Sequence, residues 1–357
     1  MLNSKRKQFA INVGSGFLNQ AVFSLVGVIL MPYAIWRLGI ESFGVYQLSR
    51  SVLVFFMFLQ LGMGPTLARY FSQAIAKKDT DTLRKINSTA LLILGMLGFL
   101  GTVVALALIP LFLTFYEIPS HSLLATSGLL ICMAFSFFFN IIGLVPNAII
   151  LGSNRYDLIN GLEIASNILR LGLIIAAFEL FFPSVLTLGI CILAAQFFRV
   201  SSFFMFAFKI AGYPALFSVG ETDKKMSRSL LGFSSLNFFN SAAFALVVQG
   251  PLLIIGKTMG VESVTMFAPA VLIASSMQGF LGQMSRPLVP MASRAQAESN
   301  VPQMGQWSMM IGNTVASLGL AIVLPLSVFG YEIIGLWLGP NMAHIWVIIA
   351  VMAIGTV

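Results

Sequence analysis

The sequence has little charge and few of the residues on which catalytic and metal sites depend. Only 9% of its 357 residues are charged, and it contains 2 histidines and 2 cysteines. Its sequence shows no metal-ligand spacing, no nucleophile motif and no glycine-rich phosphate-binding loop. We therefore expect no enzymatic activity, no metal or cofactor, and no ATP-driven transport by this chain alone.

The scarce cysteines also exclude a disulfide framework. Cys132 and Cys191 lie inside the apolar runs LLICMAF and LGICILAA, where oxidative pairing between loops is not expected. The net charge of +8 would suit a nucleic-acid partner, but the basic residues occur in short clusters between apolar runs. We interpret the basic clusters as topology signals and expect no nucleic-acid partner.

Apolar residues, in contrast, are abundant. Hydrophobic residues make up 58% of the chain, and the mean hydropathy is +0.94. This composition predicts an all-α polytopic membrane protein. Apolar runs long enough to span a bilayer can be separated at polar junctions. They cover approximately 9–36, 44–68, 88–113, 122–151, 159–181, 184–208, 229–256, 264–292, 307–329 and 341–357.

The basic residues predict the orientation of these segments. If the N-terminus is cytoplasmic, all but four of the 20 Lys and Arg residues fall on the cytoplasmic side. Arg199 is one of those expected on the cytoplasmic side. The exceptions are Arg37, Arg50, Lys257 and Arg170. Such a bias follows the positive-inside rule, and it predicts a cytoplasmic N-terminus.

An internal repeat links the two halves of the chain. The loop RLGIESFG resembles TMGVESVT, so that Gly39 corresponds to Gly260, and the same offset pairs Asn19 with Asn240. The offset spans an even number of segments, so both copies insert with the same orientation. Two six-helix bundles related by a pseudo-two-fold axis along the membrane normal are expected.

The offset also predicts domain bounds. We expect an N-terminal six-helix bundle at 1–221 and a C-terminal bundle at 222–357. The second bundle, which is the second copy of the repeat, is expected to be truncated, with about four helices present. Transporters with such repeats bind their substrates between the halves. The predicted architecture therefore favours transport.

Ionisable residues inside the predicted helices are the main candidates for function. Arg170 is central in its apolar segment, Glu163 precedes it on the same face, and Arg50 and Arg286 lie inside two other segments. An Arg at the bilayer centre costs about 2.5–3.5 kcal/mol on insertion scales, so its position indicates a function. Several guanidinium groups around one cavity would bind an anionic head group such as phosphate or pyrophosphate.

Each candidate also has a structural interpretation. Arg50 and Arg286 could extend to the lipid head groups, and Glu163 could be an interfacial residue instead of a coupling-ion site. Arg170 could form a structural ion pair with Glu163, about two helical turns away. Asn19 and Asn240 occupy equivalent repeat positions; such amides either line a wet path or join helices.

Two further segments carry proline and glycine inside a predicted helix. They are LGMGPTLARY at 61–70 and LGQMSRPLVP at 281–290. Interruptions at similar places in two halves indicate either a binding or bending element or a packing kink.

The chain resembles the Wzx-type polysaccharide (O-antigen) flippases of the MOP superfamily, which have a MATE-like fold. The resemblance rests on LMPYAIWRLGIESFGVYQL (30–48), the Gly-Pro-containing second segment, AIAKKDTDTLRKIN (74–87), GSNRYDLIN (152–160) and GPLLIIGKTMGVESV (250–264). It implies two bundles around a central cavity that opens alternately to either side of a bacterial inner membrane.

The resemblance further implies a substrate. An undecaprenyl-pyrophosphate-linked oligosaccharide would move from the cytoplasmic to the periplasmic leaflet for polysaccharide or lipopolysaccharide synthesis. H⁺ or Na⁺ would be the coupling ion, and membrane lipids and other glycan-assembly membrane proteins would be the partners. The cationic lumen expected of such flippases fits Arg170, Arg50 and Arg286.

Two alternatives remain. A MATE exporter of organic cations, coupled to H⁺ or Na⁺, is expected to use buried carboxylates, and the segment 9–36 contains no Asp or Glu. A cluster of arginines would also repel a cation. A non-transporting membrane scaffold of glycan assembly would keep its activity after the intramembrane charges are removed.

Overall fold

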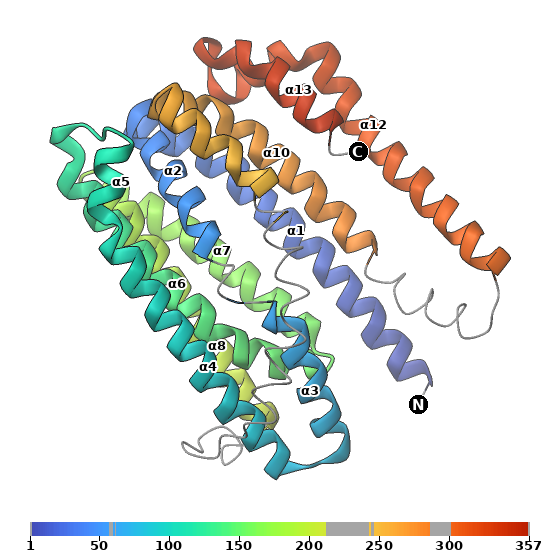
Figure 1. Ribbon diagram of the computed structural model, residues 1–357. Coiled ribbons are helices and arrows are strands. Elements are labelled where there is room, and N and C mark those ends of the chain that lie inside the picture. Colours follow the sequence, from blue (N-terminus) through green and yellow to red (C-terminus); the bar gives the residue numbers. More distant parts are fainter. Residues whose placement is uncertain are drawn as a thin grey trace. The chain divides into compact units, whose positions relative to one another are not determined.

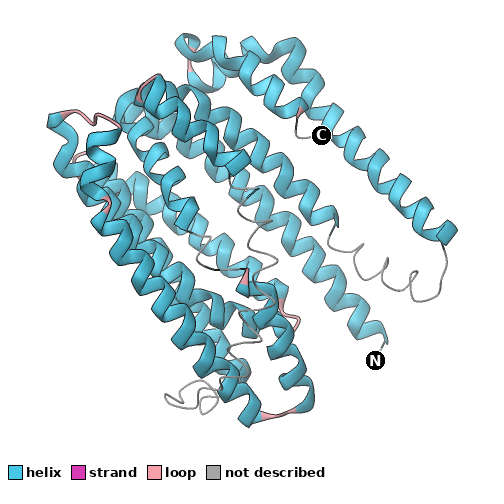
Figure 2. Cartoon of the chain, viewed as in Figure 1, coloured by secondary structure: helices cyan, strands magenta, loops and turns pink. Residues whose placement is uncertain are grey.

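The computed structural model describes residues 2–56, 60, 62–211, 243, 246–285 and 301–355. Within these ranges every regular element is a helix, and Figure 2 shows no strand there. Seven of the described helices are long and apolar enough to cross a membrane. The helices 246–258 and 340–354 are also apolar but shorter. The expected all-α polytopic fold is confirmed.

The chain forms two compact units, 35–264 and 1–34 with 265–357. The boundaries fall within α1 (Leu2–Leu38) and α10 (Val261–Ser285), and Figure 1 labels the main helices of both units. The boundary expected at 221/222 lies outside the described residues.

The larger unit contains the helices that follow α1 along the first half of the chain. They are α2 (Ile40–Phe56), α3 (Met63–Lys77), α4 (Thr80–Ala107), α5 (Ile109–Phe115), η2 (Ser120–Ser122), α6 (Leu123–Gly152), α7 (Tyr156–Leu180) and α8 (Val185–Ala211), followed by the helix 246–258. Its core lies mainly between α3, α4 and α6, where Leu67, Ile86 and Ile149 are almost fully buried.

Glycines bring α6 and α8 close together. A Cβ added at Gly143 would lie 2.9 Å from Val200 Cγ2, and one added at Gly128 would lie 2.6 Å from Leu186 Cδ1. Gly189 lies against Leu129 in the same way. Small residues at such positions allow the close backbone approach on which helix packing in lipid depends.

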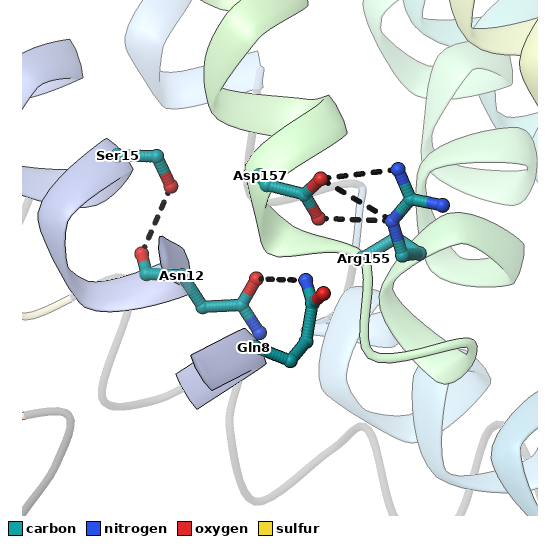
Figure 3. Close-up of polar contacts among 5 residues, drawn as sticks. All are labelled: Gln8, Asn12, Ser15, Arg155 and Asp157. Carbon is teal, nitrogen blue, oxygen red and sulfur yellow. Dashed lines mark hydrogen bonds and ion pairs between the residues drawn. The ribbon is translucent and has the colours of Figure 1, made fainter. Parts of the chain in front are cut away.

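The smaller unit is built from most of α1 (Leu2–Leu38) and α10 (Val261–Ser285), with α12 (Val301–Leu338), η4 (Pro340–Ile345) and α13 (Trp346–Ile354). Gln20 on α1 donates a hydrogen bond to the Ser276 carbonyl at 3.4 Å. The Trp337 indole donates to the Val28 carbonyl at 2.8 Å. Short polar networks also occur along α1, where Gln8 donates to Asn12 (Figure 3).

The repeat seen in the sequence has a structural counterpart. Gly39 separates α1 from α2, and Gly260 separates the helix 246–258 from α10. Their φ angles are 83° and 84°, in the left-handed region that favours glycine. The two copies therefore make the same sharp connection at corresponding positions.

The segment expected at 44–68 is not one continuous helix. α2 ends at Phe56 and α3 begins at Met63, after Gly62 in a left-handed conformation with φ 64°. Pro65 lies in the first turn of α3, where proline is tolerated because the first amides have no helical acceptor. The interruption expected here is confirmed, whereas 286–290, in the corresponding second-half stretch, lie outside the described residues.

We predict that Gly152→Ala destabilises the larger unit. A Cβ at this position would lie 2.9 Å from the Ser72 backbone nitrogen and 3.1 Å from the Ala68 carbonyl, and backbone cannot move aside as a side chain can. The cost expected of overpacking is about 1–3 kcal/mol. The thermal midpoint of the purified variant should fall.

The matched control is Gly161→Ala on α7, where an added Cβ meets nothing within 4 Å. Alanine is the better helix former, so this variant should be as stable as the wild type or slightly more stable. Equal losses in both variants would contradict the predicted role of Gly152.

Asp79 caps the N-terminus of α4, and we predict that this cap is lost in acid. The Thr82 amide donates to Asp79 Oδ1 at 2.9 Å and the Thr82 hydroxyl to Oδ2 at 2.6 Å. These hydrogen bonds lower the pKa of the Asp79 carboxyl below 3.8. The stabilisation is complete above that ordinary value and disappears as the pH falls through the lowered pKa.

Hydrogen exchange at the first turn of α4 measures this effect. Protection should decrease below pH 3.8 in the wild type and should already be low, and independent of pH, in Asp79→Ala. Acid-independent protection in the wild type would show that the carboxylate does not hold the helix end.

Candidate functional site

Three arginines on α2, α7 and α8 of the larger unit form a group with Glu163 of α7. Arg170 is on α7, and the charges of Arg50 on α2 and Arg199 on α8 are close enough to act on it. The Tyr46 phenol, one helical turn before Arg50, is also close to Arg170. The Glu163 carboxylate lies 3.7 Å from the Arg199 guanidinium. We call Arg50, Arg170, Arg199 and Glu163 the arginine cluster.

Hydrogen bonds between α7 and α8 fix their register around this cluster. The Ser166 hydroxyl donates to the Ala195 carbonyl at 3.1 Å, and the Cys191 thiol lies 3.5 Å from the Leu173 carbonyl. Glu163, Ser166 and Arg170 follow one another at helical spacing, so the face of α7 that carries the charges is the face that meets α8.

Arg50 and Arg170 lie at a common depth. The last turn of α1 meets the last turn of α7, where the Arg37 guanidinium binds the Glu179 carboxylate at 3.2 Å and also donates to the Phe178 carbonyl. The beginning of α2 and the end of α7 are therefore at the same end of the unit. From that end, Arg50 and Arg170 each lie about 15 Å along their helices, at 1.5 Å per residue.

Arg170 has no carboxylate partner in the described part of the chain. Its Nε is buried and finds no protein acceptor there, and the charged groups near it are other arginines. A guanidinium does not lose its proton in proteins, so the cluster remains cationic. A permanent charge at this depth is expensive and is normally retained for a function.

The structure brings some of the site residues predicted from the sequence close to one another and places others elsewhere. Arg50 lies close enough to Arg170 for their charges to interact, and Glu163 pairs with Arg199 instead of forming the ion pair considered for Arg170. Asn19 lies on α1 in the smaller unit. Arg286 and Asn240 lie outside the described residues.

Arg199 is not among the candidates that the sequence suggests. Arg199 is expected on the cytoplasmic side, but it lies in the interior of α8 (Val185–Ala211). Its position inside an apolar run was the signal available in the sequence. Gln196, one turn earlier, also has a buried Nε2 without a protein acceptor in the described ranges.

Polar contacts near the interrupted second segment connect other helices of the same unit. The Gln60 amide donates to Asn140 Oδ1 of α6 at 3.0 Å. The Ser51 hydroxyl on α2 donates to Gln249 Oε1 at 3.0 Å. These amides join helices, which is the structural role that intramembrane amides often have.

The opposite end of α7 carries a conventional surface pair. The Arg155 guanidinium donates to the Asp157 carboxylate at 3.0 Å (Figure 3). Nearly half of the Arg155 side chain is exposed. Arg155, the N-cap residue of α7, has a carboxylate partner and is accessible to solvent, whereas Arg170 within α7 has no carboxylate partner in the described ranges. Arg155 is therefore a suitable control for tests of Arg170.

We predict that position 170 is accessible to water. After Cys132 and Cys191 are replaced by alanine, Arg170→Cys should react with a small charged thiol reagent added in water. Ile174→Cys, one turn further along α7 at a fully buried position, should not react. Mass spectrometry of the labelled protein measures both. Equal protection of the two cysteines would contradict a wet site at Arg170.

No protein-family model matches the chain. The uncharacterized membrane protein EpsK of Bacillus subtilis (strain 168) is 20% identical over 347 residues, which are 95% of this chain and 67% of EpsK.

Solved structures give the fold. An inward-facing MATE family multidrug resistance transporter of the MOP superfamily has a TM-score of 0.73 at 15% identity, covering 94% of this chain and 78% of its own. An outward-facing structure of such a transporter has a TM-score of 0.66 at 16% identity, covering 97% and 77%. The chain therefore has the fold of the MATE transporters of the MOP superfamily.

Proposed function

We propose that this protein translocates a polyprenyl-pyrophosphate-linked oligosaccharide between the leaflets of a bacterial inner membrane, from the cytoplasmic to the periplasmic side. The observation that carries the proposal is the arginine cluster, in which Arg50 and Arg170 lie at one depth on different helices. Bidentate guanidinium groups suit the oxygens of phosphate and pyrophosphate.

The fold supports a transport cycle by alternating access. Proteins of this fold have been solved in inward-facing and outward-facing conformations. In the proposed cycle the pyrophosphate and the sugars enter the polar interior, while the polyprenyl tail stays in lipid. The membrane lipids and, in the cell, other glycan-assembly membrane proteins are the proposed partners.

Coupling to H⁺ or Na⁺ is proposed to occur at Glu163. Of the acidic residues described on α7, Glu163 lies away from both helix ends, and it faces Arg199 at 3.7 Å. A ligand or ion shifts a conformational equilibrium only by its differential affinity for the two states. A translocation rate independent of both pH and Na⁺ would remove this part of the proposal.

Export of an organic cation is the second candidate, because the solved neighbours include multidrug resistance transporters. The arginine cluster opposes it, since three guanidinium groups repel a cation through Coulomb forces. A scaffold without transport is the third, and it makes the charges of Arg50 and Arg170 dispensable.

The test is translocation in liposomes that contain the complete protein. A fluorescent polyprenyl-pyrophosphate oligosaccharide and a fluorescent organic cation are compared under the same conditions. Movement of the lipid-linked sugar alone supports the flippase. Movement of the cation alone would replace the flippase proposal with the drug-exporter alternative. Movement of neither compound would favour the scaffold without transport.

We predict that Arg170→Ala slows translocation of the lipid-linked sugar about tenfold or more. Charge-assisted hydrogen bonds contribute about 1.5–3 kcal/mol, and their loss has this effect if they form during passage. Arg170→Lys keeps the charge and should retain part of the rate. Initial rates at equal protein content measure the series.

Arg155→Ala, at the N-cap of α7, is the control and should transport at the wild-type rate, since Arg155 pairs with Asp157 away from the cluster. Normal transport by Arg170→Ala would refute the site. Loss in Arg170→Ala with full activity in Arg170→Lys would show that charge matters more than guanidinium geometry.

A further inference from the structure

Three buried nitrogen donors on α7 and α8 have no acceptor within the described chain. They are Arg170 Nε, Gln196 Nε2 and Arg199 Nε. Gln196 and Arg199 are one turn apart on α8, next to Ala195, whose carbonyl accepts from Ser166 on the charged face of α7. Buried donors are normally satisfied, so these three favour a ligand that consists of acceptors.

Arg199 is only loosely held by the protein. Its distance of 3.7 Å from Glu163 exceeds the 2.7–2.9 Å of a charge-assisted hydrogen bond. Its guanidinium carbon also lies 5.7 Å from the centre of the Phe203 ring. The Arg199 and Glu163 side chains are 22% and 31% exposed, so both groups are reachable. A phosphate oxygen could therefore replace Glu163 as the partner of Arg199 without breaking a short hydrogen bond.

The charges of the cluster select among anions. Arg50, Arg170 and Arg199 are cationic, and Glu163 compensates one of them. A phosphodiester carries one negative charge, whereas a pyrophosphate diester carries two and offers more oxygens. The pyrophosphate diester therefore balances the cluster, and the phosphodiester leaves it positively charged in a medium that disfavours unbalanced charge.

We propose that Arg199 is a third phosphate-binding residue, and that it exchanges Glu163 for a phosphate oxygen when the substrate binds. Arg199 and Glu163 together then determine the preference for a pyrophosphate-linked over a phosphate-linked lipid. This inference rests on the proposed function, and it adds the residues that distinguish the two head groups.

The test compares two lipids with the same polyprenyl chain and the same sugar, one linked through pyrophosphate and the other through a single phosphate. Both are given to liposomes with the complete protein and without an ion gradient. The wild type should prefer the pyrophosphate. In Arg199→Ala this preference should fall about tenfold, as expected for the loss of one charge-assisted hydrogen bond.

Glu163→Gln frees Arg199 and should lower the half-saturating concentration of the pyrophosphate lipid. The double variant Arg199→Ala/Glu163→Gln distinguishes direct binding from mere neutralisation of Glu163. Its cluster has the wild-type net charge, so charge balance alone would restore the preference for pyrophosphate. If Arg199 binds the second phosphate directly, the preference should instead stay as low as in Arg199→Ala. Recovery of the wild-type preference in the double variant would overturn the proposal, and so would an unchanged preference in Arg199→Ala.

The control pair is Arg155→Ala/Asp157→Asn, which removes a similar ion pair away from the cluster and should leave the preference unchanged. A second measurement does not depend on transport. Calorimetry with the purified protein should show tighter binding of inorganic pyrophosphate than of orthophosphate, and Arg199→Ala should abolish the difference.

The two measurements separate the two proposals. Movement of neither lipid, together with pyrophosphate selectivity that requires Arg199, would refute the flippase and keep the selective site. Movement of both lipids, with equal binding of both anions, would keep the flippase and refute the role of Arg199.

Discussion

The central constraint on this protein is the cost of keeping a guanidinium within a membrane-spanning helix. Arg170 cannot become neutral by losing its proton, and in the described structure it has neither a carboxylate nor an acceptor for its Nε. Its surroundings must therefore supply water, anions or both. The placement of Arg50 and Arg199 near it increases this demand, because like charges repel one another.

The close packing of α6 against α8 provides the framework that holds the arginine cluster. Glycines allow α6 and α8 to approach closely. α7 is joined to α8 by the hydrogen bond from Ser166 to the Ala195 carbonyl, and its charged side chains lie on the face toward α8. Rigid helices hold side chains more accurately than loops do. The polar groups thus depend on the close packing of α6 against α8.

Much of the fold followed from the sequence, because spanning length and apolar composition constrain a membrane helix strongly. The repeat also located Gly39 and Gly260, which have the same left-handed backbone. The division of the second apolar segment was visible only as a Gly-Pro signal. Apolar composition does not report where the backbone of a long segment leaves the helix, and α2 and α3 were therefore expected as one run.

The site was harder to predict. Arg170 and Arg50 are recognisable as candidates because each is isolated in an apolar run, whereas Arg199 is expected among the basic residues of the cytoplasmic side. Helix ends are uncertain by several residues in a sequence, and a charge near an end has an inexpensive explanation. The contact between Glu163 and Arg199 depends on the register of α7 against α8, which no single-helix pattern contains.

The repeat that contains the two glycine connections also allows the charge of Arg50 to be compared between the two copies. At the offset that aligns Gly39 with Gly260, Arg50 of α2 corresponds to Val271 of α10. The backbone geometry of the turn is duplicated, but the cation is not. The two copies therefore differ in charge at this position: the first carries a cation where the second is apolar.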